Sequence, residues 1–417
     1  MPNPGPPCGA GVFVSFPLSF MRFPFPFSAA APAAMVATGL LLAACNSGTS
    51  TADQPRGTIP ADSTAAHVPA PVPANSPLTI VAEINSPQIT GVAVAPGGKI
   101  FAFSPRWDYN PTFPVALVGA NNTLTAYPDA GWCTWNDSVK TEPQKHWISP
   151  QAGYVDTQGM LWIVDPASPG LKYTVAGGPK LVKTDPKTSK VVQTIAIPES
   201  VAPRKSYLND VRIDLQNNYA YLTESGTGSL VVVDLKTGQS RGLLKQHTST
   251  LPTPGFITKA QGHALIDPMG KPGSFKADGI ALSTDNQYLY YRALSGHSLY
   301  RIKTAVLRNA ALSPAQVSAA VEKLADAPAC DGMELDSKNN LYLTGFENGE
   351  ILRRTPEGKI ETLVKEARLE WPDTFAWDPD GKSIYFTVSE LDKTPNWNKG
   401  VGQAHEPFRI YKMALAK

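Results

Sequence analysis

The sequence of 417 residues contains only four cysteines, and no two of them form a CxxC pair. The absence of such a pair excludes a zinc ribbon and a thioredoxin-like motif. Four cysteines in so long a chain do not indicate a disulfide framework either. Each must therefore be interpreted separately: Cys8, Cys45, Cys133 and Cys330.

The sequence also lacks a charge excess and a recognisable nucleophile. Lys and Arg number 37 against 35 Asp and Glu, which gives a formal net charge of +2. This balance predicts no basic face, so nucleic acid is not an expected partner. The six histidines are scattered, and neither a GxSxG elbow nor a Ser-His-Asp spacing is present. Hydrolysis by an activated serine is not expected.

Long apolar runs are missing, and a short one lies near the N-terminus. Residues 33–44 are apolar, follow Arg22 and end in small residues before Cys45. This pattern is typical of a secretory signal. The run is shorter than the ~20 residues that span a bilayer, although a short membrane anchor and a plain signal peptide stay open as alternatives. The position of Cys45 resembles the bacterial lipobox, and that resemblance predicts that Cys45 carries a lipid.

Three segments follow from this interpretation. Residues 1–45 are expected to be an upstream extension and a lipoprotein signal peptide, and residues 77–417 are expected to form the folded domain. Residues 46–76 are rich in Ser, Thr, Ala and Pro, which predicts a disordered tether. The lipid bilayer is thus an expected partner through Cys45, and the expected location is the bacterial cell envelope, on the periplasmic side, or secreted.

A repeat runs through the remainder of the chain. Each copy has an apolar run, a turn rich in Asp, Gly or Asn, and a second run of aromatic and β-branched residues, which is typical of a β-hairpin. Several copies precede a second hairpin, so the unit has four strands. The copies are residues 91–103, 154–165, 209–223, 278–291, 331–344 and 373–387.

Six four-stranded repeats predict an all-β fold, a six-bladed β-propeller. Residues 78–83 and 408–414 are expected to pair and to close the ring. A β-sandwich is the alternative. One helix is expected over residues 313–324, because Ser313 is a good N-cap and Pro314 suits the first helical position.

A set of motifs is distributed over the folded segment, namely residues 103–107, 207–214, 220–226, 277–283, 291–296, 331–335, 371–377 and 407–411. Together these motifs resemble the yellow/major royal jelly protein family, and the similarity extends from residue 77 to the C-terminus. The resemblance implies a six-bladed propeller and a secreted location. Family members resemble pigment-pathway proteins, biogenic-amine binders and nutritional secretory proteins. The fold is also similar to that of the gluconolactonase/senescence marker group, which are metal-dependent lactone hydrolases.

Acidic and amide side chains recur at the start of the repeats. Asn209, Asp210, Asp278, Asp331 and Asp373 stand at or near the start of a first strand, so we expect them at one end of the central channel. Such an oxygen-rich mouth suits Ca²⁺ or another divalent cation better than zinc. The alternative is that each Asp only satisfies backbone N–H groups at the strand entry.

The similarity to the gluconolactonase group implies more specific roles. It places metal ligands at Asn209, Asp278 and Asp331, and catalytic groups at Asp331 and Asn209. Asp278 departs from the Asn of that pattern. The first-blade glutamate of those enzymes is missing, and Thr90 and Gly91 stand in its region.

Aromatic residues suggest binding without turnover. Trp107, Tyr154, Phe346 and Phe375 lie near predicted strand ends or loops, as does Trp397. Together with Asp278, Asp331 or Asp373 they would cage an organic amine through cation–π contacts and ion pairing. The alternative is that these rings pack between blades. Cys133 and Cys330 either pair in an exported protein or remain buried free thiols.

Three functions stay open. The first is a monomeric propeller that binds a small molecule in its channel, with or without lactonase-like or isomerase-like turnover. The second is a metal-dependent, gluconolactonase-like lactonase. The third is an envelope scaffold that binds another protein. The sequence does not decide whether the protein is an enzyme.

Overall fold

The computed structural model describes Met1, residue 73 and residues 75–85, 88–136 and 138–415. The predicted signal segment with Cys45, and nearly all of the predicted tether, lie outside the described residues. Among the residues that are described, no helix has the length and apolar character needed to cross a membrane.

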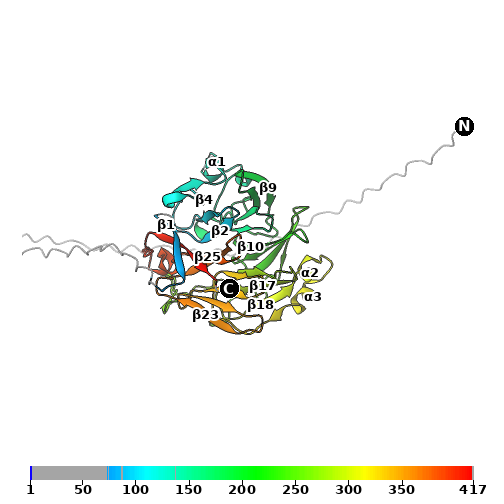
Figure 1. The fold of residues 1–417 in the computed structure, drawn as a ribbon. Helices are drawn as coiled ribbons and strands as arrows, with labels where there is room; N and C mark the ends of the chain where they lie inside the picture. Colours follow the sequence, from blue (N-terminus) through cyan, green and yellow to red (C-terminus); the bar gives the residue numbers. More distant parts are fainter. Residues whose placement is uncertain (2–72, 74, 86–87, 137, 416–417) are drawn as a thin grey trace, which may run out of the picture. The chain divides into compact units, whose positions relative to one another are not determined.

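Six four-stranded antiparallel sheets surround a common axis, which confirms the predicted propeller (Figure 1). Blade 1 contains β2 (Gly91–Ala95), β3 (Lys99–Phe103), β4 (Val115–Val118) and β5 (Leu124–Ala126). Blade 2 contains β6 (Ala152–Val155), β7 (Leu161–Asp165), β8 (Lys180–Asp185) and β9 (Lys190–Ala196). Blade 3 contains β10 (Leu208–Asp214), β11 (Tyr219–Glu224), β12 (Ser229–Asp234) and β13 (Ser240–Leu243).

The second half of the chain repeats this arrangement. Blade 4 contains β16 (Ala277–Leu282), β17 (Tyr288–Ala293), β18 (Tyr300–Lys303) and β19 (Glu322–Lys323). Blade 5 contains β20 (Met333–Leu335), β21 (Leu341–Gly345), β22 (Glu350–Arg354) and β23 (Ile360–Lys365). Blade 6 contains β24 (Pro372–Trp377), β25 (Ser383–Val388) and β26 (Phe408–Ala414), with β1 (Leu78–Ile84) as its outermost strand.

The ring of blades is closed by the first and the last strand of the domain. β1 pairs antiparallel with β26, from Leu78 opposite Met413 to Ile84 opposite Phe408. Figure 1 shows the blue β1 beside the red strands of blade 6. This pairing confirms the predicted closure, in which strands from both ends of the domain complete one blade.

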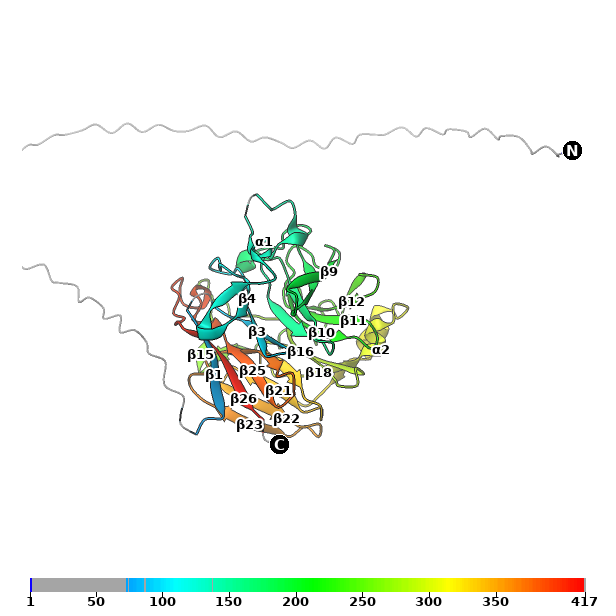
Figure 2. The ribbon, with the colours of Figure 1, turned by 45° about the horizontal axis from the view of Figure 1, so that its top comes forward.

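The innermost strands β2, β6, β10, β16, β20 and β24 line the axis. β2, β10, β16 and β20 are buried along their whole length, because each lies between neighbouring blades and the channel. Figure 2 shows β10 and β16 near the centre of the ring. Every inner strand is the first of its blade, so all six run in the same direction. Residues at their starts therefore meet at one end of the channel.

Short helices and a small hairpin sit in the connections. They are α1 (Ala130–Cys133), η1 (Ala120–Asn122), η2 (Pro143–Lys145), η3 (Pro169–Leu171), η4 (Leu391–Lys393), η5 (Pro395–Trp397), and the hairpin of β14 (Lys259–Ala260) with β15 (His263–Ala264). α1 is capped by Asp129, whose carboxylate accepts a hydrogen bond from Trp132 N at 3.0 Å. Of these elements, η3 and η4 contribute Leu171 and Leu391 to the channel mouth described below.

The predicted helix over residues 313–324 is wrong in its extent. α3 (Pro314–Ala319) begins as expected, with Ser313 and Gln316 forming a capping box. It ends early because Glu322 and Lys323 pair with β18 as the fourth strand of blade 4. Sheet pairing at this edge therefore overrides helix propensity.

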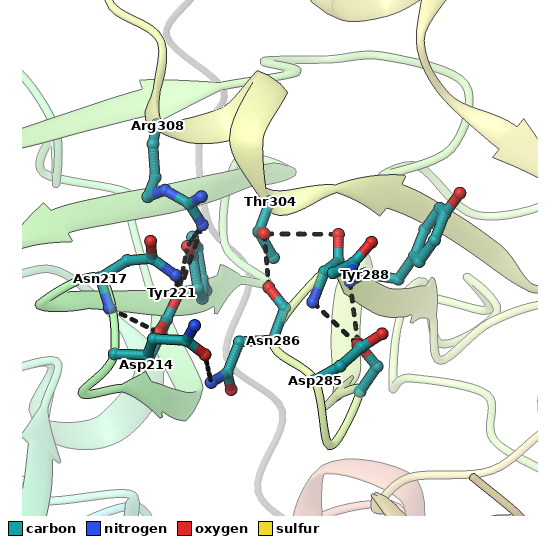
Figure 3. Close-up of polar contacts among 11 residues, drawn as sticks. Asp214, Asn217, Tyr221, Asp285, Asn286, Tyr288, Thr304 and Arg308 are labelled. Atoms are coloured by element: carbon teal, nitrogen blue, oxygen red, sulfur yellow. Dashed lines mark hydrogen bonds and ion pairs between the residues drawn. The ribbon is translucent and has the colours of Figure 1, made fainter.

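A second helix, α2 (Thr304–Arg308), fastens blade 4 to blade 3 (Figure 3). Its Arg308 Nη1 donates to Tyr221 Oη at 3.0 Å and lies 3.3 Å from Asp214 Oδ2. Asn217 Nδ2 also donates to Asp214 Oδ2, at 2.8 Å. Thr304 Oγ1 donates to the Asn286 carbonyl at 2.6 Å, which ties the helix to its own blade. The contact is structural and lies outside the channel.

Candidate functional site

Six polar residues form a ring at one end of the channel. Each lies within two residues of the start of an inner strand, and together they are Thr90, Gln151, Asn209, Asp278, Asp331 and Asp373. Hydroxyl groups of neighbouring blades reach their carbonyl oxygens: Thr223 Oγ1 donates to Asp278 O at 2.6 Å, and Thr387 Oγ1 to Thr90 O at 2.7 Å. Blades 1–3 contribute the neutral half of this ring, and blades 4–6 contribute the acidic half.

The two Asp-Gly pairs bring the acidic half together. A Cβ on Gly279 would lie 2.6 Å from the Asp331 carbonyl oxygen, and a Cβ on Gly332 would lie 2.2 Å from the Asp373 carbonyl oxygen. Only glycine permits so close an approach of adjacent inner strands. The glycines thus set the spacing of the three aspartates.

A cavity of about 370 Å³ opens above the ring. Its base includes Gln151, Asn209, Asp278, Asp331 and Asp373, and its walls include Trp107, Leu171, Tyr173, Tyr207, Phe275, Leu294 and Leu391. Lys172, Arg204 and Lys205, which are exposed, also line it and form its rim. The cavity therefore combines an acidic base, aromatic walls and a basic rim.

The aspartates of the base resist ionisation, because their pKa values are raised. Burial raises the pKa of Asp331 to about 7. Burial also raises the pKa of Asp278 and of Asp373 well above the usual range, and the charges of Asp331 and Asp210 add to both shifts. Burial raises the pKa of Asp210 as well, against the lowering effect of Arg212. Like charges in one buried mouth resist simultaneous ionisation.

Asp278 and Asp331 behave as a pair. A hydrogen bond between the two carboxyl groups raises the pKa of Asp278 and lowers that of Asp331. The pKa of Asp278 is therefore raised further than that of Asp331, so Asp278 is the harder of the two to ionise. Both side chains line the cavity.

Trp371 supports this pair from a strained position. Its Nε1–H donates to Asp331 Oδ2 at 2.7 Å, and its ring stacks on Phe346 with centroids 4.3 Å apart. The φ angle of Trp371 is +60°, in the left-handed region that bulky residues rarely adopt. Such strain concentrates at functional sites, where the surrounding structure holds it. Here it aims the indole N–H at the carboxylate.

A hydrogen-bonded chain stiffens the opposite wall. Trp107 Nε1 donates to Tyr207 Oη at 2.8 Å, and Tyr207 Oη donates to Gln151 Oε1 at 2.5 Å. Tyr207 N donates to Glu224 Oε1 at 2.9 Å. Beside it, the hydroxyl of Ser206 is buried and has no hydrogen-bond partner among the described residues. Ser206 lines the cavity, and its hydroxyl oxygen is buried beside it.

The residues expected to bind a ligand are split between two places. Trp107, Asn209, Asp278, Asp331 and Asp373 line the cavity at the mouth. The others of the predicted set, Tyr154, Phe346 and Phe375, do not line it. Phe346 is fully buried and stacks on Trp371, so it packs behind the side chains that line the mouth.

Tyr154 and Phe375 instead line a second cavity, of about 360 Å³, at the far end of the channel. Both lie further along their inner strands than the ring residues do. Trp397, also considered from the sequence, packs edge-on against Phe275 at 5.6 Å and stands behind the cavity wall. These positions correct the expectation that all the aromatic residues enclose one site.

A buried ion pair separates the two cavities. Arg212 Nη2 of blade 3 lies 3.1 Å from Glu334 Oε2 of blade 5 and also donates to the Met333 carbonyl at 2.5 Å. The Arg212 guanidinium lies 5.1 Å from the centre of the Tyr154 ring of blade 2. Blades 3 and 5 are not adjacent, so this contact crosses the channel. The mouth is therefore a closed pocket and not one end of an open pore.

The donor set was tested against the expected divalent cation. Asn209, Asp278 and Asp331 all line the cavity, but Asp278 and Asp331 are engaged with each other, and Trp371 donates to Asp331. In the part of the chain that the structure describes, no three His, Cys, Asp or Glu side chains are placed to hold one metal ion. Ca²⁺ takes six to eight oxygen ligands. The arrangement of these side chains does not fit such an ion.

The two described cysteines are free and buried. Cys133 Sγ lies 3.7 Å from the Val115 carbonyl oxygen in blade 1, and Cys330 Sγ lies 3.5 Å from Arg292 Nη1 between blades 4 and 5. Of the two alternatives drawn from the sequence, buried free thiols describe this structure.

Several residues of the site were not expected from the sequence, namely Gln151, Lys172, Arg204, Ser206, Tyr207 and Trp371. Two of them had a signal, because Tyr207 and Trp371 belong to segments that carry the family resemblance. The others lie in connections between strands, where no periodic pattern predicts which side chain turns inward.

Comparison with known proteins agrees with the fold and the repeat motifs. The sequence profile of the major royal jelly protein family matches residues 148–392, which is more than half of the chain. This chain belongs to the major royal jelly protein family. The match includes the inner strands of blades 2–6 and thus all three aspartates of the acidic half. A comparison with curated proteins finds no significant match.

Solved structures also resemble this family member, at low sequence identity. A Bacteroides thetaiotaomicron protein of unknown function has 13% identity and a TM-score of 0.50, over 81% of this chain and 75% of that one. A gluconolactonase from Xanthomonas campestris has 11% identity and a TM-score of 0.48, over 81% and 89%. The calcium-binding protein regucalcin from Agrobacterium tumefaciens has 13% identity and a TM-score of 0.46, over 80% and 93%. At these identities the likeness concerns the fold alone.

Proposed function

We propose that this royal jelly family protein binds a small organic cation, an amine, in the cavity at its channel mouth. The observation that carries the proposal is the buried Asp278–Asp331 pair, which lines the cavity together with aromatic side chains and forms no ion pair within the described residues. Pockets of this volume with a few convergent polar groups suit small ligands. Aromatic faces beside a carboxylate are a favourable environment for an ammonium group.

The charge state of the cavity explains why a cation is the fitting ligand. Asp331 has its pKa raised from 3.8 to about 7, a shift that corresponds to about 4 kcal/mol against ionisation. A bound ammonium group favours the ionised carboxylate and offsets this cost. Binding of the cation is thus linked to release of a proton from the Asp278–Asp331 pair.

Calorimetric titration of the full chain with 2-phenylethylamine and tryptamine tests the proposal. We expect binding that strengthens from about pH 5 to about pH 8, because Asp331 ionises near pH 7 while alkyl amines stay protonated up to about pH 10. Repeating the titration in buffers of different ionisation enthalpy measures the released proton. The matched variant Asp278→Asn should lose the binding. An affinity that is flat with pH, or no binding of either amine, contradicts the proposal.

Ca²⁺ or another divalent cation at Asn209, Asp278 and Asp331 remains a prediction from the sequence, and with it a gluconolactonase-like activity. Elemental analysis of the chain purified without chelator, beside Asp331→Asn, tests it. Near-stoichiometric metal in the native chain that is lost in the variant would show that the cavity binds a metal ion and not an amine. No metal in either protein after calcium is added back leaves the amine.

We further propose that the protein is exported and anchored to the bacterial envelope by a lipid on Cys45, which lies outside the described residues. The short apolar run before Cys45 supports this proposal. Incorporation of labelled palmitate should occur in the native chain and stop in Cys45→Ser, which should also move from the membrane to the soluble fraction. Equal labelling of both chains would contradict a lipid at this position.

A further inference from the structure

We propose that the ligand of this cavity is a zwitterion, an amino acid with an aromatic or bulky apolar side chain. Its ammonium group would meet the acidic half of the ring, and its carboxylate would meet Lys172, Arg204 and Lys205, called the basic arc below. The ammonium half of this inference rests on the proposed function. The carboxylate half rests on separate observations.

The basic arc lies across the mouth from the aspartates. Lys172 follows η3 in the connection between β7 and β8 of blade 2, and Arg204 and Lys205 lie in the connection that enters β10 of blade 3. All three line the same cavity as Asp331 and Asp373, which belong to blades 5 and 6. In a ring of six, blades 2 and 3 stand opposite blades 5 and 6. The cavity is therefore dipolar from one side to the other.

The basic arc has no acidic partner of its own. None of its three side chains forms an ion pair among the described residues. Arg204 instead stacks over the ring of Tyr173, with its guanidinium carbon 5.2 Å from the ring centre. Stacking holds a guanidinium by its face and leaves its N–H edge free, and that edge matches a carboxylate with two parallel hydrogen bonds.

Ser206 supplies an independent sign of a missing oxygen partner. Its side chain is 2% exposed, lines the cavity and has a hydroxyl without a hydrogen-bond partner among the described residues. A buried hydroxyl left unpaired is unfavourable, and natural structures rarely leave one. Ser206 directly follows Lys205 and precedes Tyr207, and all three residues line the cavity. A ligand carboxylate held by the arc is the group that would accept from it.

The size and charge of the cavity narrow the ligand further. A volume of about 370 Å³ is near the lower end of the range for small-molecule sites, which suits an amino acid better than a peptide. A simple amine would leave the basic arc and Ser206 without a partner. A simple carboxylic acid would leave the aspartates without a cation. Only a ligand that carries both charges satisfies both sides, and the aromatic walls then contact its side chain.

Three probes of one shape test this inference in the full chain by calorimetric titration. L-tryptophan carries both charges, tryptamine lacks the carboxylate and 3-indolepropionate lacks the ammonium. We expect L-tryptophan to bind at least about tenfold more tightly than tryptamine, the factor typical of a charge-assisted contact. Arg204→Gln should lower the affinity for L-tryptophan to that for tryptamine and leave tryptamine unchanged. Ser206→Ala should lower the affinity for L-tryptophan alone.

Matched controls separate a site from a general charge effect. Lys172→Gln should weaken L-tryptophan, whereas Lys187→Gln, the same change in the turn between β8 and β9 at the far end of the same blade, should not. Circular dichroism of each variant confirms that the fold is retained, since all three basic side chains of the arc are exposed. Tryptamine that binds as tightly as L-tryptophan overturns the zwitterion and keeps the proposed function. Failure of both amine-bearing probes, or tightest binding of 3-indolepropionate, overturns both.

Discussion

The two ends of the channel treat their acidic side chains in opposite ways. At the far end, Glu334 lies 3.1 Å from Arg212, and Asp378 lies 2.8 Å from Lys412. Asp156 accepts a hydrogen bond from Trp162 Nε1 at 2.8 Å. Burial raises the pKa of Glu334, but the charge of Arg212 lowers it, whereas at the mouth the charges of Asp331 and Asp210 add to the raised pKa values of Asp278 and Asp373. The same inner strands thus carry compensated acids at one end and uncompensated acids at the other.

This difference suggests that the acids at the far end stabilise the fold, whereas those at the mouth are suited to binding a ligand. A buried acid with a cationic partner contributes to holding the strands in place, and its removal leaves a charge unpaired. Buried acids without a partner cost stability, and a cavity that holds them gains when a cation enters. The mouth is therefore the end of the channel at which a ligand changes the free energy most.

The largest effect is expected from breaking the compensated end. Arg212→Met leaves Glu334 buried and unpaired, so the free energy of unfolding should fall by about 3–5 kcal/mol. Urea unfolding at pH 7 measures this. The double variant Arg212→Met/Glu334→Leu should recover most of the loss, because the unpaired charge is then gone. A single variant as stable as the native chain would show that the ion pair does not hold the channel closed.

At the mouth, removing an acid is expected to raise the free energy of unfolding. Because the pKa of Asp331 is raised from 3.8 to about 7 in the folded protein, the unfolded chain binds fewer protons between these values. The native chain should therefore lose stability as the pH rises from about 4 to about 7. Asp331→Asn removes this penalty and should be more stable than the native chain at pH 8, by up to about 4 kcal/mol.

At about pH 2.5 the same pair of proteins should unfold at nearly the same urea concentration, since Asp331, with a pKa near 3.8 in the unfolded chain, is then mostly protonated in both states. Urea titrations at the two pH values make the comparison. A variant that is less stable than the native chain at pH 8 would place Asp331 among the compensated acids.

The smallest effect sharpens the comparison without removing an acid. Trp371→Phe deletes the indole N–H that holds down the pKa of Asp331, so this pKa should rise above about 7. The pH at which tryptamine affinity reaches half of its maximum should move upward, with little change in the limiting affinity at high pH. Phe keeps the stacking on Phe346, so it is a matched replacement. An unchanged midpoint would show that the indole does not tune this carboxyl.

The fold was predictable because the sequence of each repeat indicates its hairpins locally. Alternating apolar residues and Asp-Gly or Asn-Asn turns define the hairpins locally. The meeting of Asn209, Asp278, Asp331 and Asp373 at one end of the channel follows as well, because the strand starts of a propeller must share one end. The sequence cannot show that the helix after Ser313 yields to a strand at Glu322, because that pairing partner is distant in the chain.

The aromatic residues illustrate a second limit. Tyr154 and Phe375 lie only a few positions along their inner strands from Gln151 and Asp373, yet that distance moves them to the other cavity. The basic arc and Ser206 lie in long connections whose conformation is set by tertiary contacts. The left-handed backbone at Trp371 has no local signature either, since a preceding glutamate and a following proline do not require it.

The pairing of β1 with β26 also bears on how the molecule is made. The strand that opens the domain finds its partner more than 300 residues later, from Leu78 to Met413. While the nascent chain is still growing, blades 1–5 can form in order, but blade 6 lacks β26, the strand that joins β1 to β25, and the ring of blades is not closed. Until synthesis reaches residues 408–414, unpaired strand edges at both sides of the gap remain open to other chains. The pairing of β1 with β26, which closes the ring of blades, is therefore among the last steps of folding. It also depends most on contacts between residues that are distant in the chain.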